Sequence, residues 1–177
     1  VNPEIIFCDS ERINVTKKFT KCKVFDCTNL NKNKVLQNNL NEDIIQYSTE
    51  DDINLIIYSS GTTGSPKGVC ISQKALCFNA FTATISQKLV YNDKYMSITP
   101  LSHAAAGLRV FTMISNGQTH YVQKKFEVKF FLENFKKYKI TTLIAVPTQL
   151  KKLLNDEKFN ISFLKSLRLL VYGASYS

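Results

Sequence analysis

The chain has 177 residues, of which 44% are hydrophobic and 21% charged, and its formal net charge is +9. This is the composition of a globular domain with one substantial core, and no apolar run approaches the length of a membrane span. The positive charge would suit a polyanionic partner. Only three of the basic residues are arginine, however, and the lysines are scattered along the sequence, which disfavours a nucleic-acid role.

The five cysteines are odd in number and form no Cys-x-x-Cys pair, and the chain has only two histidines. This pattern favours reduced thiols in a cytoplasmic protein over a disulfide framework or a zinc site. The chain begins with Val1 and ends at Ser177, directly after a predicted strand. These two ends predict that the chain is an internal piece of a longer protein.

The first predicted elements are two short strands, residues 3–8, predicted to be buried, and residues 22–26, joined by a polar connection. Two strands with a spacer between them are compatible with a βαβ unit, although this spacer is short. Residues 29–52 are rich in asparagine, lysine and acidic side chains and are predicted to be a surface excursion.

The central part of the chain is predicted to be strand, turn, strand and helix. Residues 53–58 are uniformly apolar apart from one asparagine and predict a buried strand, and residues 69–71 predict a second strand. Ser72 is placed to cap the helix that follows. That helix, residues 72–89, carries apolar side chains all round and is therefore predicted to be buried.

The rest of the chain alternates short strands and helices. The predicted strands are residues 95–98, 119–122, 141–146 and 167–172. Helices are predicted over residues 104–114, over the amphipathic stretch 128–138, and briefly after Thr148, with a turn at Gly117. This order indicates an α/β fold with a largely parallel sheet and flanking helices.

A loop rich in glycine and hydroxyl groups joins the two central strands. It reads Tyr58-Ser59-Ser60-Gly61-Thr62-Thr63-Gly64-Ser65-Pro66-Lys67-Gly68-Val69. Its glycines allow a close backbone approach, successive N–H groups can form an anion-binding nest, and Lys67 adds a movable positive charge. These features predict a polyphosphate-binding loop. The alternative is an ordinary exposed hairpin with a solvated lysine.

The order of residues in this loop distinguishes it from the Walker loop, whose Gly-Lys-Ser/Thr end runs directly into a helix. Here Lys67 is followed by glycine, valine and a predicted strand. The string instead resembles the phosphate loop of the adenylate-forming superfamily, which includes acyl-CoA synthetases, luciferases and peptide-synthetase adenylation domains. The resemblance implies a catalytic role for Lys67 and ATP binding by Ser59, Ser60, Gly61, Thr62, Thr63, Gly64, Ser65, Lys67 and Gly68.

Three later segments resemble the same family in the same order. Residues 99–107, Thr-Pro-Leu-Ser-His followed by alanines and glycine, resemble its second core motif. There the histidine lies between the acyl pocket and the activated carboxylate, which implies that His103 is catalytic. Taken alone, a histidine at this position is more often a structural residue that caps or hydrogen-bonds the turn, and the phosphate loop reverses that preference. His120 lacks such a context and is predicted to be structural.

Residues 142–148 resemble the strand that ends in Val-Pro-Thr and lines the acyl side, although a buried strand stopped by proline explains them equally well. Residues 170–175 resemble the segment that passes beside the adenine. This resemblance implies that Gly173, Ala174 and Ser175 border the nucleotide.

The resemblance implies ATP-dependent activation of a carboxylic acid to an acyl-adenylate and then to a coenzyme A thioester. A fatty acid is the favoured candidate for that acid. Mg²⁺ would arrive with ATP, and no metal ligand is assigned to this chain. Residues 1–177 would form part of the large N-terminal domain. The family's C-terminal domain with its catalytic lysine is not in this sequence, so the chain alone is expected to be inactive.

Two other functions stay open, an adenylation domain that loads a carrier protein and a truncated nucleotide-binding protein without catalysis. The expected partners are a small carboxylic acid, ATP and coenzyme A, and not nucleic acid. The expected location is the cytoplasm, with peripheral contact to a membrane as a second option.

Overall fold

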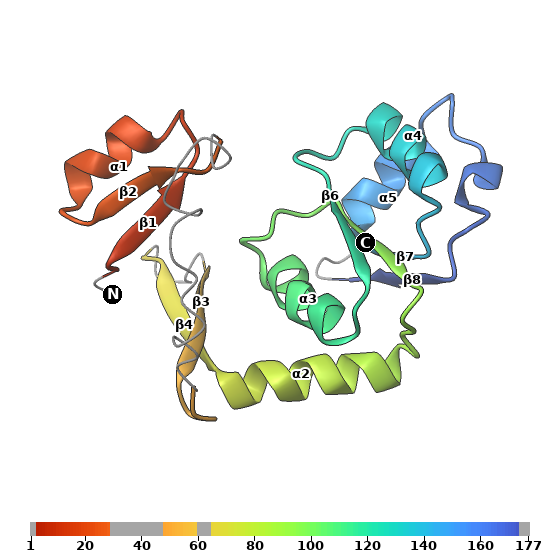
Figure 1. Cartoon of the computed structure of the whole chain (residues 1–177). Coiled ribbons are helices and arrows are strands. Elements are labelled where there is room, and N and C mark those ends of the chain that lie inside the picture. The colour runs from red at the N-terminus through yellow and green to blue at the C-terminus, as the bar shows by residue number, and fades with distance from the viewer. Residues whose placement is uncertain (1–2, 29–47, 60–64, 174–177) are drawn as a thin grey trace. The chain divides into compact units, whose positions relative to one another are not determined.

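The computed structural model describes residues 3–28, 48–59 and 65–173. The chain divides into two compact units, Val1–Tyr47 and Ser48–Ser177, each with its own internal packing (Figure 1). Most of the predicted surface excursion, residues 29–47, lies outside the described residues.

The smaller unit is a strand–helix–strand arrangement. β1 (Ile5–Cys8) and β2 (Lys23–Asp26) pair in parallel, and α1 (Ile13–Phe19) lies between them in the sequence. The helix has only seven residues, which explains how a short spacer can still return the chain to a parallel strand. The predicted βαβ unit is thereby confirmed, but the predicted burial of the first strand is wrong, since Ile5 and Phe7 are 48% and 55% exposed.

The larger unit contains a four-stranded sheet in the order β6-β5-β7-β8, with every neighbouring pair parallel. These strands are β5 (Lys94–Ser97), β6 (Thr119–Val122), β7 (Thr142–Ala145) and β8 (Leu169–Tyr172). The predicted parallel sheet is confirmed here. Because all four strands run in one direction, their carboxyl ends lie at the same edge of the sheet (Figure 1).

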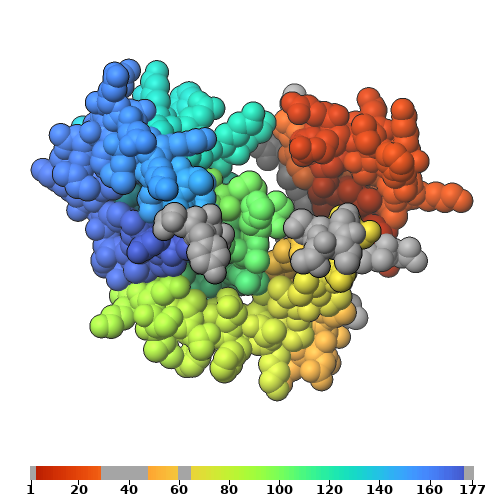
Figure 2. All heavy atoms as spheres, turned by 180° about the vertical axis from the view of Figure 1, so that it is seen from behind, coloured from red at the N-terminus to blue at the C-terminus, as the bar shows by residue number. Residues whose placement is uncertain are grey.

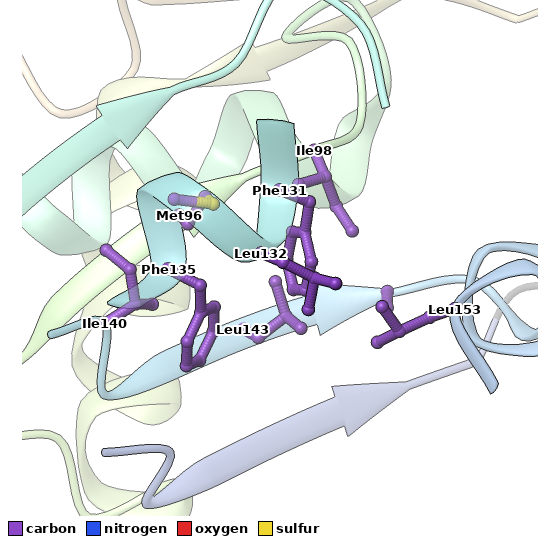
Figure 3. Packing of buried hydrophobic residues seen from close by; sticks show 9 residues of the cluster. Met96, Ile98, Phe131, Leu132, Phe135, Ile140, Leu143 and Leu153 are labelled. Atoms are coloured by element: carbon purple, nitrogen blue, oxygen red, sulfur yellow. The ribbon is translucent and has the colours of Figure 1, made fainter. Parts of the chain in front are cut away.

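One face of this sheet is covered by α4 (Val128–Tyr138), α5 (Pro147–Leu154) and the 3₁₀ turn η3 (Ile161–Leu164). Phe131, Leu132 and Phe135 project from α4 onto the strands, and both phenylalanines are fully buried (Figure 3). They complete a core cluster with Met96, Ile98, Ile140, Leu143, Ala145 and Leu153. The amphipathic pattern predicted for this helix is confirmed, and each buried phenylalanine contributes about 1.5–3 kcal/mol.

The opposite face of the sheet is covered by α3 (Ala104–Ser115), against which α2 (Gln73–Ser86) packs. Tyr95 and Met113 form a second buried cluster with Leu89 on this face. Tyr95 and Met96 are consecutive residues of β5, and they enter different clusters because side chains alternate along a strand.

The predicted cap at the start of α2 is confirmed, but its predicted burial is wrong. Ser72 Oγ accepts a hydrogen bond from the Ala75 N–H at 3.3 Å. Phe78, Phe81 and Ile85 are 68%, 64% and 60% exposed. One face of the helix contacts α3. The opposite face is also apolar, and it stays exposed (α2, yellow-green, in Figure 2).

The predicted burial of the central strand is also wrong. β3 (Ile53–Ser59) pairs antiparallel with β4 (Lys67–Ser72), and within the described residues these two form a sheet of their own. Ile53 and Tyr58 are 60% and 62% exposed, and the residues between them are at most partly buried. The hairpin is therefore the antiparallel exception to the largely parallel fold.

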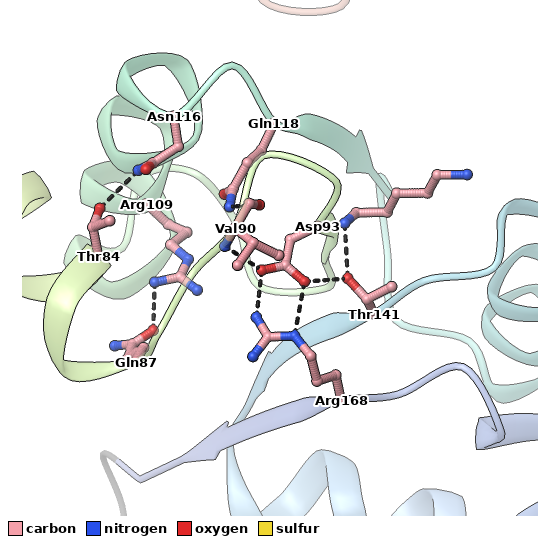
Figure 4. A network of polar contacts seen from close by, with 10 residues as sticks. Thr84, Gln87, Val90, Asp93, Arg109, Asn116, Gln118, Thr141 and Arg168 are labelled. Carbon is pink, nitrogen blue, oxygen red and sulfur yellow. Dashed lines mark hydrogen bonds and ion pairs between the residues drawn. The ribbon is translucent and has the colours of Figure 1, made fainter.

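A buried carboxylate joins the amino ends of three sheet strands. Asp93, 2% exposed, accepts hydrogen bonds from the Val90 N–H at 2.9 Å, Thr141 Oγ1 at 2.8 Å and both Nε and Nη2 of Arg168 (Figure 4). Burial alone would raise the pKa of Asp93, but these hydrogen bonds and the Arg168 charge together hold it below its ordinary value.

A buried arginine lies on the α3 face of the sheet. The Arg109 guanidinium lies 5.4 Å from the centre of the Tyr95 ring and donates to Gln87 Oε1 at 2.6 Å. Its Nε and Nη2 have no hydrogen-bond partner within the described part of the chain. Burial therefore lowers the pKa of Arg109, an effect that the Tyr95 and Asp93 charges partly oppose.

No helix among the described residues is long and apolar enough to cross a membrane.

Candidate functional site

The glycine-rich loop is framed by the β3–β4 hairpin. Ser59 ends β3 and lies opposite Lys67, the first residue of β4, and Ser59 Oγ is 3.4 Å from the Lys67 carbonyl oxygen. The chain enters a strand after the loop, and not a helix, which agrees with the distinction from a Walker loop. Ser59, Ser65 and Lys67 are exposed, so their side chains are accessible to a ligand.

Five predicted phosphate-binding residues lie outside the described part of the chain: Ser60, Gly61, Thr62, Thr63 and Gly64. The hairpin fixes only the two points between which they run. Gly68, the remaining predicted member of the loop, lies in β4 opposite Tyr58. A Cβ at Gly68 would lie 3.1 Å from Ile56 Cγ2, so a side chain at this position would crowd β3.

His103 lies between the end of β5 and the first turn of α3. Its extended backbone places it at the N-cap, where its carbonyl oxygen accepts from the Ala106 and Gly107 N–H groups at 3.1 and 2.8 Å. The His103 side chain is exposed and makes no capping hydrogen bond. The imidazole is thus not used to cap the helix, which removes one structural explanation for a histidine here.

A hollow of about 340 Å³ joins His103 to the strand that enters the loop. On one side it is lined by residues 55–58 of β3, and on the other by Leu101, Ser102, His103 and Gly107. Most of this lining is apolar, with the imidazole and the hydroxyls of Ser102 and Tyr58 as its polar groups. Small-molecule sites combine these properties at about this size.

Gly107 allows the first turn of α3 to lie against the chain that precedes it. A Cβ on Gly107 would be 2.7 Å from the Leu101 carbonyl oxygen, which is closer than real Cβ atoms come to backbone. A larger residue would therefore push α3 away from the segment that holds His103.

The two remaining motifs follow neighbouring strands at the same sheet edge. Ala145 of β7 pairs with Tyr172 of β8, so Val146 and Gly173 leave the sheet side by side. Pro147 then begins α5, and the Gln149 side chain binds it back to the sheet by accepting from the Val146 N–H at 3.0 Å and donating to the Ile98 carbonyl at 3.1 Å. Both strand ends therefore lie at the edge that also carries the β5–α3 connection.

Gly173 is the last described residue of its motif, and Ala174 and Ser175 lie outside the described residues. A Cβ at Gly173 would meet no atom of the described residues within 4 Å, so none of them crowds this position. His120 lies elsewhere, on β6, with its ring centre 4.9 Å from that of Tyr95. Burial lowers the pKa of His120, and the Arg109 charge lowers it further. Both effects favour the neutral ring expected of a structural residue.

Sequence reasoning missed the contribution of β3 to this hollow, because it treated the strand as part of the core. The signal was present, since a strand that runs directly into a glycine and serine loop presents its last residues beside that loop. In the described residues no three His, Cys, Asp or Glu side chains gather as a metal site.

A family profile described as "AMP-binding enzyme" matches residues 2–176, almost the whole chain. The chain belongs to the AMP-binding enzyme family. Membership confirms the resemblance first indicated by the loop and by the order of the later motifs.

Curated relatives of this AMP-binding family chain are CoA ligases with different acids in their names. A probable 4-coumarate–CoA ligase 1 of Dictyostelium discoideum is 35% identical over 151 residues, which are 81% of this chain and 27% of that protein. The medium/long-chain-fatty-acid–CoA ligase FadD8 of Mycobacterium tuberculosis is 31% identical over 125 residues, 71% of this chain and 22% of that protein. The chain spans about a quarter of the length of these relatives.

The fold is shared with a solved CoA synthetase. The o-succinylbenzoate CoA synthetase of Bacillus subtilis, solved with its acyl-adenylate intermediate, superposes with a TM-score of 0.81 at 23% identity. The match covers 98% of this chain and 44% of that protein. This similarity confirms the predicted α/β architecture.

Proposed function

We propose that this chain is part of an AMP-forming acid–CoA ligase that activates a carboxylic acid with ATP and transfers the acyl group to coenzyme A. The observation that carries the proposal is the hollow shared by β3 and the β5–α3 connection. It brings the strand entering the glycine-rich loop together with an imidazole that makes no capping bond. Both lie in a fold shared with an enzyme solved with an acyl-adenylate.

In the proposed reaction, a carboxylate oxygen attacks the α-phosphorus of ATP and pyrophosphate leaves. The thiol of coenzyme A then attacks the acyl carbon, AMP leaves, and the thiol proton is lost to solvent. The loop from Ser59 to Gly68 would hold the β- and γ-phosphates through hydroxyl and backbone donors. Lys67, opposite Ser59 at the mouth of the hairpin, would offset their negative charge.

His103 would orient the acyl carboxylate from the opposite wall of the hollow, since its side chain is exposed there. Gly173, Ala174 and Ser175 would border the adenine, and no described residue comes within 4 Å of a Cβ at Gly173, which leaves space for a flat ring on that side. Mg²⁺ would be brought by ATP. No described group of side chains fits it, so no step is assigned to the ion.

The acid is proposed to be a fatty acid, because Leu55, Ile57 and Leu101 make the hollow largely apolar. An aromatic acid is the second candidate, since one relative is named for 4-coumarate. Adenylation followed by loading of a carrier protein uses the same loop and differs only in the thiol acceptor. The proposed location is the cytoplasm.

Residues 1–177 are proposed to be part of an N-terminal domain that needs a further domain, with its own lysine, for turnover. The test of this part is direct. The 177-residue chain alone should release no pyrophosphate in the presence of ATP and acid, and carboxylate-dependent release would contradict the assignment.

The site assignment is tested in the complete ligase by acid-dependent exchange of pyrophosphate into ATP. Lys67→Ala should lower this exchange about 100-fold, because one preorganised group that neutralises phosphate charge is lost. His103→Ala should also lower exchange, with its effect on the KM for the acid and not on that for ATP. The matched control is Lys74→Ala on α2, an exposed lysine paired with Glu50 at 2.9 Å, which should leave exchange unchanged.

Unchanged exchange in Lys67→Ala would remove the loop assignment. A panel of medium- and long-chain fatty acids and hydroxycinnamic acids then identifies the substrate class. Parallel reactions with coenzyme A and with a phosphopantetheinylated carrier protein separate the two acceptor classes.

A further inference from the structure

The positive charge of the chain is concentrated in one layer of the larger unit. Residues 123–168 contain eleven basic and four acidic residues, a net charge of +7 out of +9 for the chain. This segment forms α4, β7, α5, η3 and their connections, and its helices lie at the surface (cyan to blue in Figure 2). Its ten lysines are all exposed: Lys124, Lys125, Lys129, Lys136, Lys137, Lys139, Lys151, Lys152, Lys158 and Lys165.

Ion pairs within the described residues leave almost all of this charge unneutralised. Across residues 3–28, 48–59 and 65–173, no ion pair involves any of these ten lysines. The ion pair that does involve this segment joins Arg168 to the buried Asp93. The lysines, which the sequence led us to expect scattered, therefore form an unpaired basic layer over one face of the sheet.

Large apolar side chains are exposed within the same basic layer. Phe130 of α4 is 50% exposed, Leu154 at the end of α5 is 64% exposed, and Ile161 at the start of η3 is 71% exposed. Between these elements lies a hollow of about 750 Å³ that is lined by Lys129, Lys136 and Lys158 together with apolar and acidic side chains. Three acidic side chains line the hollow beside these three lysines, whereas the three exposed apolar residues belong to the surrounding layer and not to its lining.

We propose that this basic layer is a docking surface for membranes that contain anionic phospholipids. Lysines near such a surface are attracted by its negative potential, and exposed apolar side chains can enter the headgroup region. A nucleic-acid surface would favour arginines that bind phosphate bidentately, whereas all but one of the basic residues here are lysines. The inference does not depend on the proposed ligase reaction.

The test uses the complete polypeptide and sedimentation with vesicles of phosphatidylcholine, with or without about one third phosphatidylserine. Binding should require phosphatidylserine and weaken as salt is raised. One lysine at an anionic surface contributes about fivefold to partitioning. The variant Lys129→Gln/Lys136→Gln/Lys158→Gln should therefore partition about 10- to 100-fold less. These side chains are exposed, so the fold should be kept, and circular dichroism checks it.

Two further variants identify what is recognised. Lys17→Gln/Lys18→Gln/Lys21→Gln removes the same charge from exposed positions in the smaller unit and should retain most of the binding. Phe130→Ser/Leu154→Ser/Ile161→Ser keeps the charge and should still weaken vesicle binding at least about fivefold.

Equal losses in the two lysine variants would overturn the proposal, because net charge alone would then explain binding. Retention of a single-stranded RNA without any vesicle binding would overturn it in favour of nucleic acid. An apolar variant with unchanged vesicle binding would overturn it in favour of a general polyanion site.

Discussion

Replacing Asp93 with asparagine removes one charge from the junction of β5, β7 and β8 while keeping the size of the side chain. The carboxylate is 2% exposed and accepts four hydrogen bonds, two of them from the Arg168 guanidinium. Thr141 Oγ1, which donates to Asp93, also accepts from the Lys94 N–H at 2.9 Å. Three strand starts are therefore linked through one side chain.

The expected cost follows from what an amide can still accept. Asparagine keeps one oxygen and turns an NH₂ group toward donors, so at least two of the four bonds are lost. Hydrogen bonds to charged groups contribute about 1.5–3 kcal/mol each. The Arg168 side chain is 40% exposed, so water can replace part of the hydrogen bonding that its guanidinium loses. We expect Asp93→Asn to lower the free energy of unfolding by about 2–4 kcal/mol.

The assay is urea unfolding followed by circular dichroism, with hydrogen exchange at the Lys94 and Arg168 amides as a local measurement. The matched control is Glu50→Gln, which also replaces a carboxylate by an amide in an ion pair. Glu50 and Lys74 are 75% and 69% exposed, so this change should cost less than about 1 kcal/mol.

The pKa of Asp93 gives the same prediction a pH dependence. This pKa is lowered in the folded state, so the stabilisation is fully present above the unfolded value of about 4. It is lost as the pH falls through the lowered folded-state pKa. The difference between the original protein and Asp93→Asn should therefore shrink on acidification. A cost below about 1 kcal/mol at pH 7, or a difference that does not change with pH, would refute the reasoning.

Two further predictions concern packing. Gly107→Ala should lower the free energy of unfolding by about 1–3 kcal/mol, because the new Cβ would lie 2.7 Å from the Leu101 carbonyl oxygen. Gly173→Ala should lower it little, since that position is open; equal effects in urea unfolding would contradict this explanation. Phe131→Ala should cost about 3–5 kcal/mol, and Phe130→Ala, at a half-exposed position, less than about 1 kcal/mol. Similar unfolding midpoints for these two variants would show that α4 is not packed as described.

Sequence reasoning predicted the elements whose side chains alternate clearly between two environments. The apolar stripe of α4, at Phe131, Leu132 and Phe135, matches the face that is buried. It failed where apolar residues give no direction. On α2 such residues occur all round the helix, and the sequence does not say which of them α3 covers. The sequence therefore did not show that Phe78 and Phe81 are exposed.

Polar contacts between distant segments were equally invisible in the sequence. Asp93 and Arg168 are far apart in the chain, and neither belongs to a motif, so only the parallel register of β5, β7 and β8 brings them together. In the sequence Arg109 is only one of three arginines, and nothing indicates that it is buried over Tyr95. Such pairings depend on strand order, which periodicity along one strand does not determine.

The same strand order explains why the motifs could be assigned to one site before the fold was known. β5, β7 and β8 are neighbours and run in parallel, so segments that follow them in the sequence must leave from one edge of the sheet. His103, Val146 and Gly173 each follow one of these strands. In an antiparallel sheet, motifs after successive strands would alternate between two edges. A parallel α/β sheet therefore turns an ordered series of motifs into a single candidate site, as parallel sheets do in general at their carboxyl ends.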